Sequence, residues 1–236
     1  MLYCLTAMFI NNLIMRTHTK EFFDNLTPHQ AYDVLKEGNR RFVKNLKINR
    51  NLQQQLMETA KAQYPFAVAL SCMDSRTAVE LIFDQGFGEV FSIRIAGNVI
   101  NDDILGSMEY ACKVVGSKLI MVLGHTKCGA IRGACDGVEL GNLTPLLEKI
   151  KPAVESTRPY GFGEHNHLFA EKVAYTNVIN SMEEILQRSE IIRSLCEQGK
   201  IGIVGGMFSL ESGRVHFVRE VLPKEAPEPV LVSMAG

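Results

Sequence analysis

Residues 65–76 read PFAVALSCMDSR, an apolar run that ends in a cysteine, an aspartate and an arginine. A second run of the same kind at residues 118–128, KLIMVLGHTKC, ends in a histidine and a cysteine. Short continuous apolar runs of this length are typical of buried parallel strands. Because ligands bind beyond the carboxyl ends of the strands in an open α/β sheet, the two polar motifs are expected to meet at one edge of such a sheet.

The composition is that of an ordinary globular protein. The 236 residues are 46% hydrophobic and 22% charged, which allows a sizeable core. The formal net charge of −1, without a basic cluster, disfavours binding to nucleic acid or to an anionic membrane surface. Six cysteines in a chain of this length do not resemble a secreted disulfide framework. A reducing, cytoplasmic compartment is therefore predicted, where thiolates stay free to bind metal.

The two ends of the chain are predicted to lie outside a single catalytic domain over residues 26–222. Residues 1–25 are expected to be flexible or loosely docked, and residues 223–236 to form a loosely ordered tail. The apolar stretch Leu2–Ile10 resembles a signal-peptide core, which leaves export open as an alternative, but no basic residue precedes it and no clear cleavage site follows. It is too short to span a bilayer, which takes ~20 apolar residues.

Helices and strands are predicted along the whole domain. Thr27 is expected to cap a helix that begins at Pro28 and ends at Gly38-Asn39. Strands are predicted over residues 66–71, 90–95, 119–123, 201–208 and 215–218. Further helices are predicted over residues 52–62, 78–83, 102–115, 143–154 and 168–198, with another directly after Cys128.

Cys72, His125 and Cys128 form the most specific pattern in the sequence. Taken singly, each is more often structural, the cysteines as buried core residues and the histidine as a hydrogen-bonded one. Their arrival at the ends of two predicted parallel strands favours a metal site instead. Two thiolates and one imidazole are three zinc ligands of the catalytic type, which leave a fourth position free for water or an exchangeable group.

Asp74 and Arg76 add a mechanism to this site. Alternate residues of an extended segment share a side, so Cys72, Asp74 and Arg76 can face the same way. In one interpretation the two charges form a surface ion pair worth less than ~1 kcal/mol. In the other, Arg76 holds Asp74 in a fixed orientation through a bidentate pair. Asp74 would then accept a hydrogen bond from a zinc-bound hydroxide or, in a closed state, ligate the zinc itself.

With these motifs the sequence resembles the β-class carbonic anhydrases. The matching motifs sample most of residues 26–220 and are Leu26-Thr27-Pro28, Gly38-Asn39-Arg40-Arg41-Phe42, Cys72 to Glu80, Phe83-Asp84-Gln85-Gly86, Arg94-Ile95-Ala96-Gly97-Asn98, and Leu123-Gly124-His125 through Cys128-Gly129-Ala130. The resemblance implies zinc on Cys72, His125 and Cys128, and an Asp74–Arg76 dyad beside it.

The resemblance also implies roles for four further residues. Gln63, nine residues before Cys72, would reach the active site across a dimer interface. Phe91 and Tyr110 would form an aromatic wall for the substrate, and core packing is the plain alternative for both. The backbone N–H of Gly129 would lie near the substrate.

Two departures from the family pattern stand out. Met73 occupies a position where serine is usual, and it is expected to point away from the metal. One subgroup of the family has a bicarbonate-regulated inactive form built on a Trp–Arg–Tyr pocket. The matching positions here are Ala69, Arg94 and Phe208, so regulation through that pocket is not expected.

The expected architecture is an α/β fold with a central, mostly parallel sheet. We expect four parallel strands in the order 2-1-3-4, an antiparallel fifth strand at one edge, helices on both faces and an N-terminal helical arm. The resemblance implies a homodimer in which these arms embrace the partner, or a homotetramer.

The expected activity is zinc-dependent, reversible hydration of carbon dioxide to bicarbonate and a proton. Zinc-bound hydroxide would attack the carbon while the Asp74–Arg76 dyad orients it. Two alternative functions also use a bound zinc ion. A hydrolase of carbon disulfide or carbonyl sulfide would use the same fold, and a non-catalytic zinc protein would keep Asp74 as a permanent fourth ligand.

Overall fold

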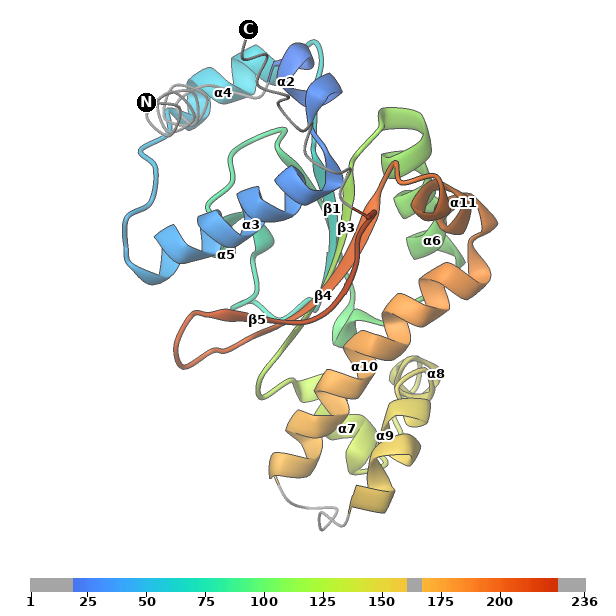
Figure 1. Cartoon of the computed structure of the whole chain (residues 1–236). Coiled ribbons are helices and arrows are strands. Elements are labelled where there is room, and N and C mark those ends of the chain that lie inside the picture. The colour runs from blue at the N-terminus through green and yellow to red at the C-terminus, as the bar shows by residue number, and fades with distance from the viewer. Residues whose placement is uncertain (1–18, 161–166, 225–236) are drawn as a thin grey trace, which may run out of the picture.

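The computed structural model describes residues 19–160 and 167–224. These residues form a five-stranded sheet, which lies at the centre of the domain in Figure 1. The strand order is β2-β1-β3-β4-β5. The first four strands are parallel and β5 is antiparallel to β4, which confirms the predicted fold class and strand order. The strands are β1 (Ala67–Ser71), β2 (Val90–Arg94), β3 (Leu119–His125), β4 (Gly202–Phe208) and β5 (Val215–Val221). The predictions for residues 1–18 and 225–236 lie outside the described residues.

Helices cover both faces of the sheet (Figure 1). One face is covered by α2 (Lys20–Asn25), α3 (Pro28–Val43) and α5 (Val79–Ile82), and α4 (Leu52–Thr59) completes the N-terminal arm. The other face carries η1 (Ala96–Asn98), α6 (Asp102–Glu109), the π-turn η2 (Tyr110–Val115), α7 (Gly129–Cys135), α8 (Leu143–Glu148), α9 (Lys151–Thr157), α10 (His167–Arg188) and α11 (Glu190–Glu197), with a short 3-10 turn, η3 (Arg158–Tyr160), after α9. None of the helices in the described ranges combines the length and the apolarity needed to cross a bilayer.

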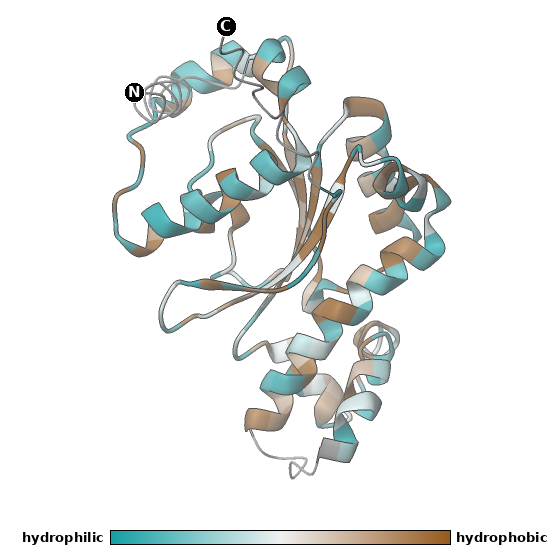
Figure 2. Ribbon diagram, in the orientation of Figure 1, coloured by the Kyte–Doolittle hydropathy of each residue, from teal (hydrophilic) through white to brown (hydrophobic). Residues whose placement is uncertain are grey.

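Alternate residues of the inner strands feed two separate hydrophobic cores. Val68 and Leu70 of β1 pack toward α6 and α10, whereas Ala67 and Ala69 pack toward α3 and α5. Every residue of β1 and β3 is buried, and the central strands are mostly hydrophobic in Figure 2. Burial on both faces explains why these strands are continuous apolar runs in the sequence.

Helix α3 is longer than predicted, because Gly38 and Asn39 do not end it. A Cβ atom at Gly38 would lie 1.8 Å from the carbonyl oxygen of Phe83, so this glycine allows close packing of the helix. The Asn39 amide donates to the carbonyl of Gly213 at 3.0 Å, and its oxygen accepts from the N–H of Val215 at 2.9 Å. Both residues therefore attach α3 to the body of the domain, and the helix continues to Val43.

Two predicted helices are each divided in two. The helix expected over residues 168–198 is interrupted at Ser189, whose extended backbone and side chain cap a new helix by accepting from the N–H of Ile192. The helix expected over residues 143–154 is divided near Ile150, and its second half has a proline in its first turn. Both divisions follow from helix-start signals that lie inside a longer apolar pattern.

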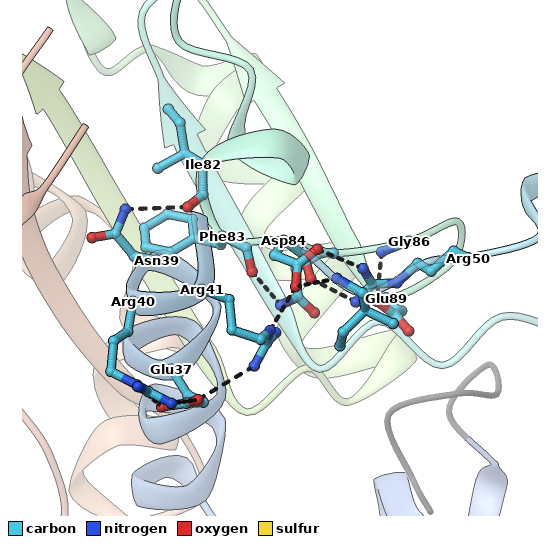
Figure 3. A network of polar contacts seen from close by, with 12 residues as sticks. Glu37, Asn39, Arg40, Arg41, Arg50, Ile82, Phe83, Asp84, Gly86 and Glu89 are labelled. Atoms are coloured by element: carbon cyan, nitrogen blue, oxygen red, sulfur yellow. Dashed lines mark hydrogen bonds and ion pairs between the residues drawn. The ribbon is translucent and has the colours of Figure 1, made fainter. Parts of the chain in front are cut away.

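A buried polar network around Asp84 fastens the N-terminal arm to the domain (Figure 3). The Asp84 carboxylate accepts hydrogen bonds from Arg41 Nε at 2.6 Å and from Arg50 Nη1 at 2.7 Å. Arg50 also donates to the backbone oxygen of Asp84 at 2.6 Å. Arg41 lies on α3 and Arg50 precedes α4, and their side chains are 13% and 9% exposed. One buried carboxylate thus joins two segments of the arm.

Replacing Asp84 with Asn should lower the free energy of unfolding by about 3–5 kcal/mol. The substitution removes the carboxylate that pairs with the buried guanidinium groups of Arg41 and Arg50. Asn keeps the size and tolerates the left-handed backbone at this position, φ 48°. Urea unfolding at one fixed protein concentration measures the effect. The control Asp33→Asn breaks the exposed Lys36–Asp33 pair and should cost less than about 1 kcal/mol. Equal losses in the two variants would contradict a stabilising role for the network.

Candidate metal centre

Three buried side chains converge where β1 and β3 end. Cys72 follows β1 directly, His125 is the last residue of β3, and Cys128 is the N-cap of α7. The ligand atoms of these three residues all lie within 4.8 Å of one another. The two sulfur atoms are 3.9 Å apart. The sharp turn between His125 and Cys128 is made by Lys127, which has a left-handed backbone with φ 56°.

The ring of His125 is oriented so that one nitrogen remains available to a metal. Nδ1 lies 2.9 Å from the carbonyl oxygen of Thr126, and a carbonyl only accepts, so Nδ1 carries the hydrogen. Nε2 then bears the lone pair, and it is buried without a hydrogen-bond partner. A buried, unpartnered nitrogen beside two thiols fits a metal ion, and two sulfurs with one imidazole are a donor set that suits zinc.

The two thiols share their protons unequally. The hydrogen bond from Cys128 lowers the pKa of Cys72, and the Gly97 N–H, 3.4 Å from the Cys72 sulfur, favours the thiolate further. The same Cys72–Cys128 contact, together with burial, raises the pKa of Cys128. Cys72 is therefore the sulfur that its surroundings hold as a thiolate, and the pair titrates as a unit.

Asp74 and Arg76 form the bidentate pair predicted from the sequence. Arg76 Nε lies 2.9 Å from Asp74 Oδ1 and Arg76 Nη2 lies 2.7 Å from Oδ2. The backbone N–H of Arg76 also donates to Oδ1 at 2.9 Å. These hydrogen bonds hold the pKa of Asp74 well below its usual range, so the carboxylate is ionised. The Asp74 side chain is 17% exposed, whereas that of Arg76 is 54% exposed.

Thr77 and Arg94, for which the sequence predicts no role at the metal centre, hold residues 72–76, the metal loop, in place. The Thr77 hydroxyl lies 2.9 Å from the carbonyl oxygens of both Cys72 and Asp74. Arg94 is the last residue of β2 and pairs with Ser71 of β1. It donates from Nε to the Cys72 carbonyl at 3.2 Å and from Nη2 to the Asp74 carbonyl. The guanidinium of Arg94 thus binds backbone of the metal loop.

Phe91 and Tyr110 come together, but away from the three candidate ligands. Their ring centroids are 6.4 Å apart, on β2 and at the start of the π-turn η2. They line an open hollow of about 630 Å³, whose described lining includes neither the two cysteines of the centre nor its histidine. Tyr110 is 55% exposed, whereas Phe91 is half-buried and packs against the hydrophobic core.

Gly129 and Gln63 lie at opposite ends of the sheet. Gly129 begins α7 directly after Cys128, and a Cβ added there would meet nothing within 4 Å, so space is open beside the centre. Gln63 is exposed and precedes β1, at the amino end of the strand whose carboxyl end leads to Cys72. The structure does not bring Gln63 to the three candidate ligands of its own chain.

Comparison with known proteins gives a consistent result. A family model described as carbonic anhydrase matches residues 67–215. Carbonic anhydrase of Mycolicibacterium smegmatis is 35% identical over 198 residues, which are 81% of this chain and 93% of that protein. Carbonic anhydrase 2 of Mycobacterium tuberculosis is 36% identical over 196 residues, or 80% of this chain and 92% of that protein.

Solved structures show the same fold. The β-carbonic anhydrase CafA of Aspergillus fumigatus superposes with a TM-score of 0.64 at 26% identity, covering 70% of this chain and 81% of that one. The β-carbonic anhydrase CcaA superposes with a TM-score of 0.64 at 24% identity, covering 82% of this chain and 92% of that one. Because the family model spans more than half of the chain and relatives above 30% identity align over about four fifths of it, this chain belongs to the β-class carbonic anhydrases.

Proposed function

We propose that this chain hydrates carbon dioxide reversibly to bicarbonate and a proton, with zinc held by Cys72, His125 and Cys128. The observation that carries the proposal is the buried Nε2 of His125, which has no hydrogen-bond partner and lies with two sulfur atoms inside a 4.8 Å cluster. When bound there, zinc supplies Lewis acidity that makes hydroxide available near neutral pH.

Asp74 is the residue that we propose to orient the nucleophile. A carboxylate accepts hydrogen bonds and cannot donate one, so ionised Asp74 would fix the hydrogen of hydroxide and direct an oxygen lone pair toward the carbon. Arg76 keeps the carboxylate ionised and occupies both of its oxygens. The same carboxylate, released from Arg76, is a competent zinc ligand, and in that closed state it would block the position that the nucleophile needs.

Gln63, Phe91, Tyr110 and Gly129 are proposed to complete the substrate site, with Gln63 supplied by a second copy of the chain. Nine residues separate Gln63 from Cys72, which is ~30 Å of extended chain, far beyond the reach of a glutamine side chain. A homodimer or homotetramer is supported by this separation, by exposed Tyr110 beside the edge strand β2, and by a structural neighbour from Sordaria macrospora that is described as tetrameric.

A cytoplasmic location is proposed from the state of the cysteines. The five cysteines in the described ranges are all free. Two of them belong to the proposed zinc site, which requires them in reduced form.

Arg76→Ala should lower carbon dioxide hydration by about 100-fold or more while zinc stays bound, because Asp74 loses the partner that orients it. Stopped-flow hydration by zinc-loaded wild-type and variant protein measures the turnover, and elemental analysis measures the zinc. The control Arg40→Ala breaks another bidentate pair, Arg40–Glu37, at a distant exposed position and should leave turnover unchanged.

Three outcomes would contradict this account. Near-normal turnover in the Arg76 variant would show that the dyad does not orient the nucleophile. Loss of zinc would make Arg76 a structural residue. Wild-type protein that hydrolyses carbonyl sulfide or carbon disulfide but does not hydrate carbon dioxide would reassign the substrate.

Mixing a Gln63→Ala variant with an Arg76→Ala variant should recover activity after subunit exchange, because one of the two hybrid sites then carries neither change. Mixing Asp74→Asn with Arg76→Ala is the matched control, since both residues come from the same chain and every site keeps one defect. Stopped-flow assays before and after exchange measure the recovery. A fully active monomer, or no recovery after exchange has been demonstrated, would exclude the shared site.

A further inference from the structure

The turn η1, which follows β2, carries an N–H group to the metal centre. Gly97 at its middle has a left-handed backbone, φ 66°, and its N–H points at the Cys72 sulfur at 3.4 Å. A Cβ at Gly97 would lie 2.7 Å from Ile150 Cδ1 and 3.3 Å from Ala130 Cβ. The left-handed backbone favours glycine here, and a larger residue would also have to displace the end of the Ile150 side chain.

Helix α10 holds this turn from a distance of 80 residues in the sequence. Asn177 Nδ2 donates to the carbonyl oxygen of Gly97 at 2.9 Å. One helical turn later, Ser181 Oγ donates to the carbonyl oxygen of Asn98 at 3.3 Å. The side chains of Asn177 and Ser181 are almost fully buried. Because residues four apart lie on the same side of a helix, two neighbouring donors of α10 fix two successive carbonyls of the turn.

An N–H donor on one sulfur changes what the metal centre can do. Two thiolates offset the charge of a divalent cation and weaken it as a Lewis acid. A hydrogen bond to a thiolate draws electron density away from the sulfur, so a metal on Cys72 keeps more of its acidity. The position of the Gly97 N–H therefore bears on the reaction, and α10 determines that position.

We propose that Asn177 is a positioning residue of the carbonic anhydrase reaction, acting through the Gly97 N–H on the Cys72 sulfur. Ser181 supports it through the weaker hydrogen bond to Asn98. This inference rests on the proposed zinc site, since it assumes that Cys72 binds the metal. Asn177 touches neither substrate nor metal in this role.

The test uses full-length protein loaded with cobalt(II), whose bonds to thiolates give a charge-transfer band in the near ultraviolet. Asn177→Ala should move this band to longer wavelength, because a sulfur without its hydrogen bond gives up electrons more easily. In the zinc-loaded protein, kcat should fall by about 10–100-fold with little change in KM. Ser181→Ala, which removes a single oxygen, should shift the band in the same direction by a smaller amount.

Asn180→Ala makes the same substitution on the same helix at a half-buried position and is the matched control, with an unshifted band expected. A band at the wild-type wavelength in both the Asn177 and the Ser181 variant would overturn the inference. If the Asn177 variant does not fold, Ser181→Ala alone decides between a shift and none. Absence of any sulfur-to-cobalt band in the wild-type protein would instead refute the proposed ligands, so the two failures are distinguishable.

Discussion

The parallel pairing of β1 with β3 determines where the chemistry of this protein lies. Its register sets Ser71 beside Leu123, so both strands reach the same edge of the sheet together. That pairing places Cys72 and His125 close together, and the turn after His125 brings Cys128 into the same cluster. A shift of one residue would turn the alternate side chains of β1 toward the opposite core, so the two hydrophobic faces hold the register and, through it, the site.

The metal loop is held by contacts from distant elements, because the loop itself is short and partly exposed. Arg94 of β2 binds its backbone carbonyls, and α10 reaches it through the turn that contains Gly97. Elsewhere in the domain, the Asp84 network fastens the N-terminal arm that leads to Gln63. The three candidate ligands are thus buried beside a short, partly exposed loop, and polar hydrogen bonds from β2 and α10 make a single arrangement of this loop more favourable than others.

Much of this architecture can be predicted from the sequence. The buried strands are readable because both faces of the sheet are covered, and Thr27 with Pro28 marks the start of α3 by local capping chemistry. The three candidate ligands can be predicted because Cys72 directly follows one strand, His125 ends another, and Cys128 comes three residues later at the start of a helix. The wrong predictions came from local sequence signals at positions where contacts with distant residues determine the structure. Gly38 lies inside a helix because it packs closely against the backbone of Phe83. The residues next to Gly38 in the sequence give no sign of this contact.

The supporting hydrogen bonds could not be predicted for the same reason. Asn177 lies inside a long helical pattern, 80 residues from the carbonyl that it binds, and its spacing is no different from that of other polar helical residues.

X-ray absorption at the zinc edge of the zinc-loaded protein tests the central claim most directly, because it counts the atoms bound to the metal. The account predicts two sulfur atoms at about 2.3 Å and at least one histidine nitrogen at about 2.0–2.1 Å. A zinc ion with no sulfur ligand, or with one, would contradict it.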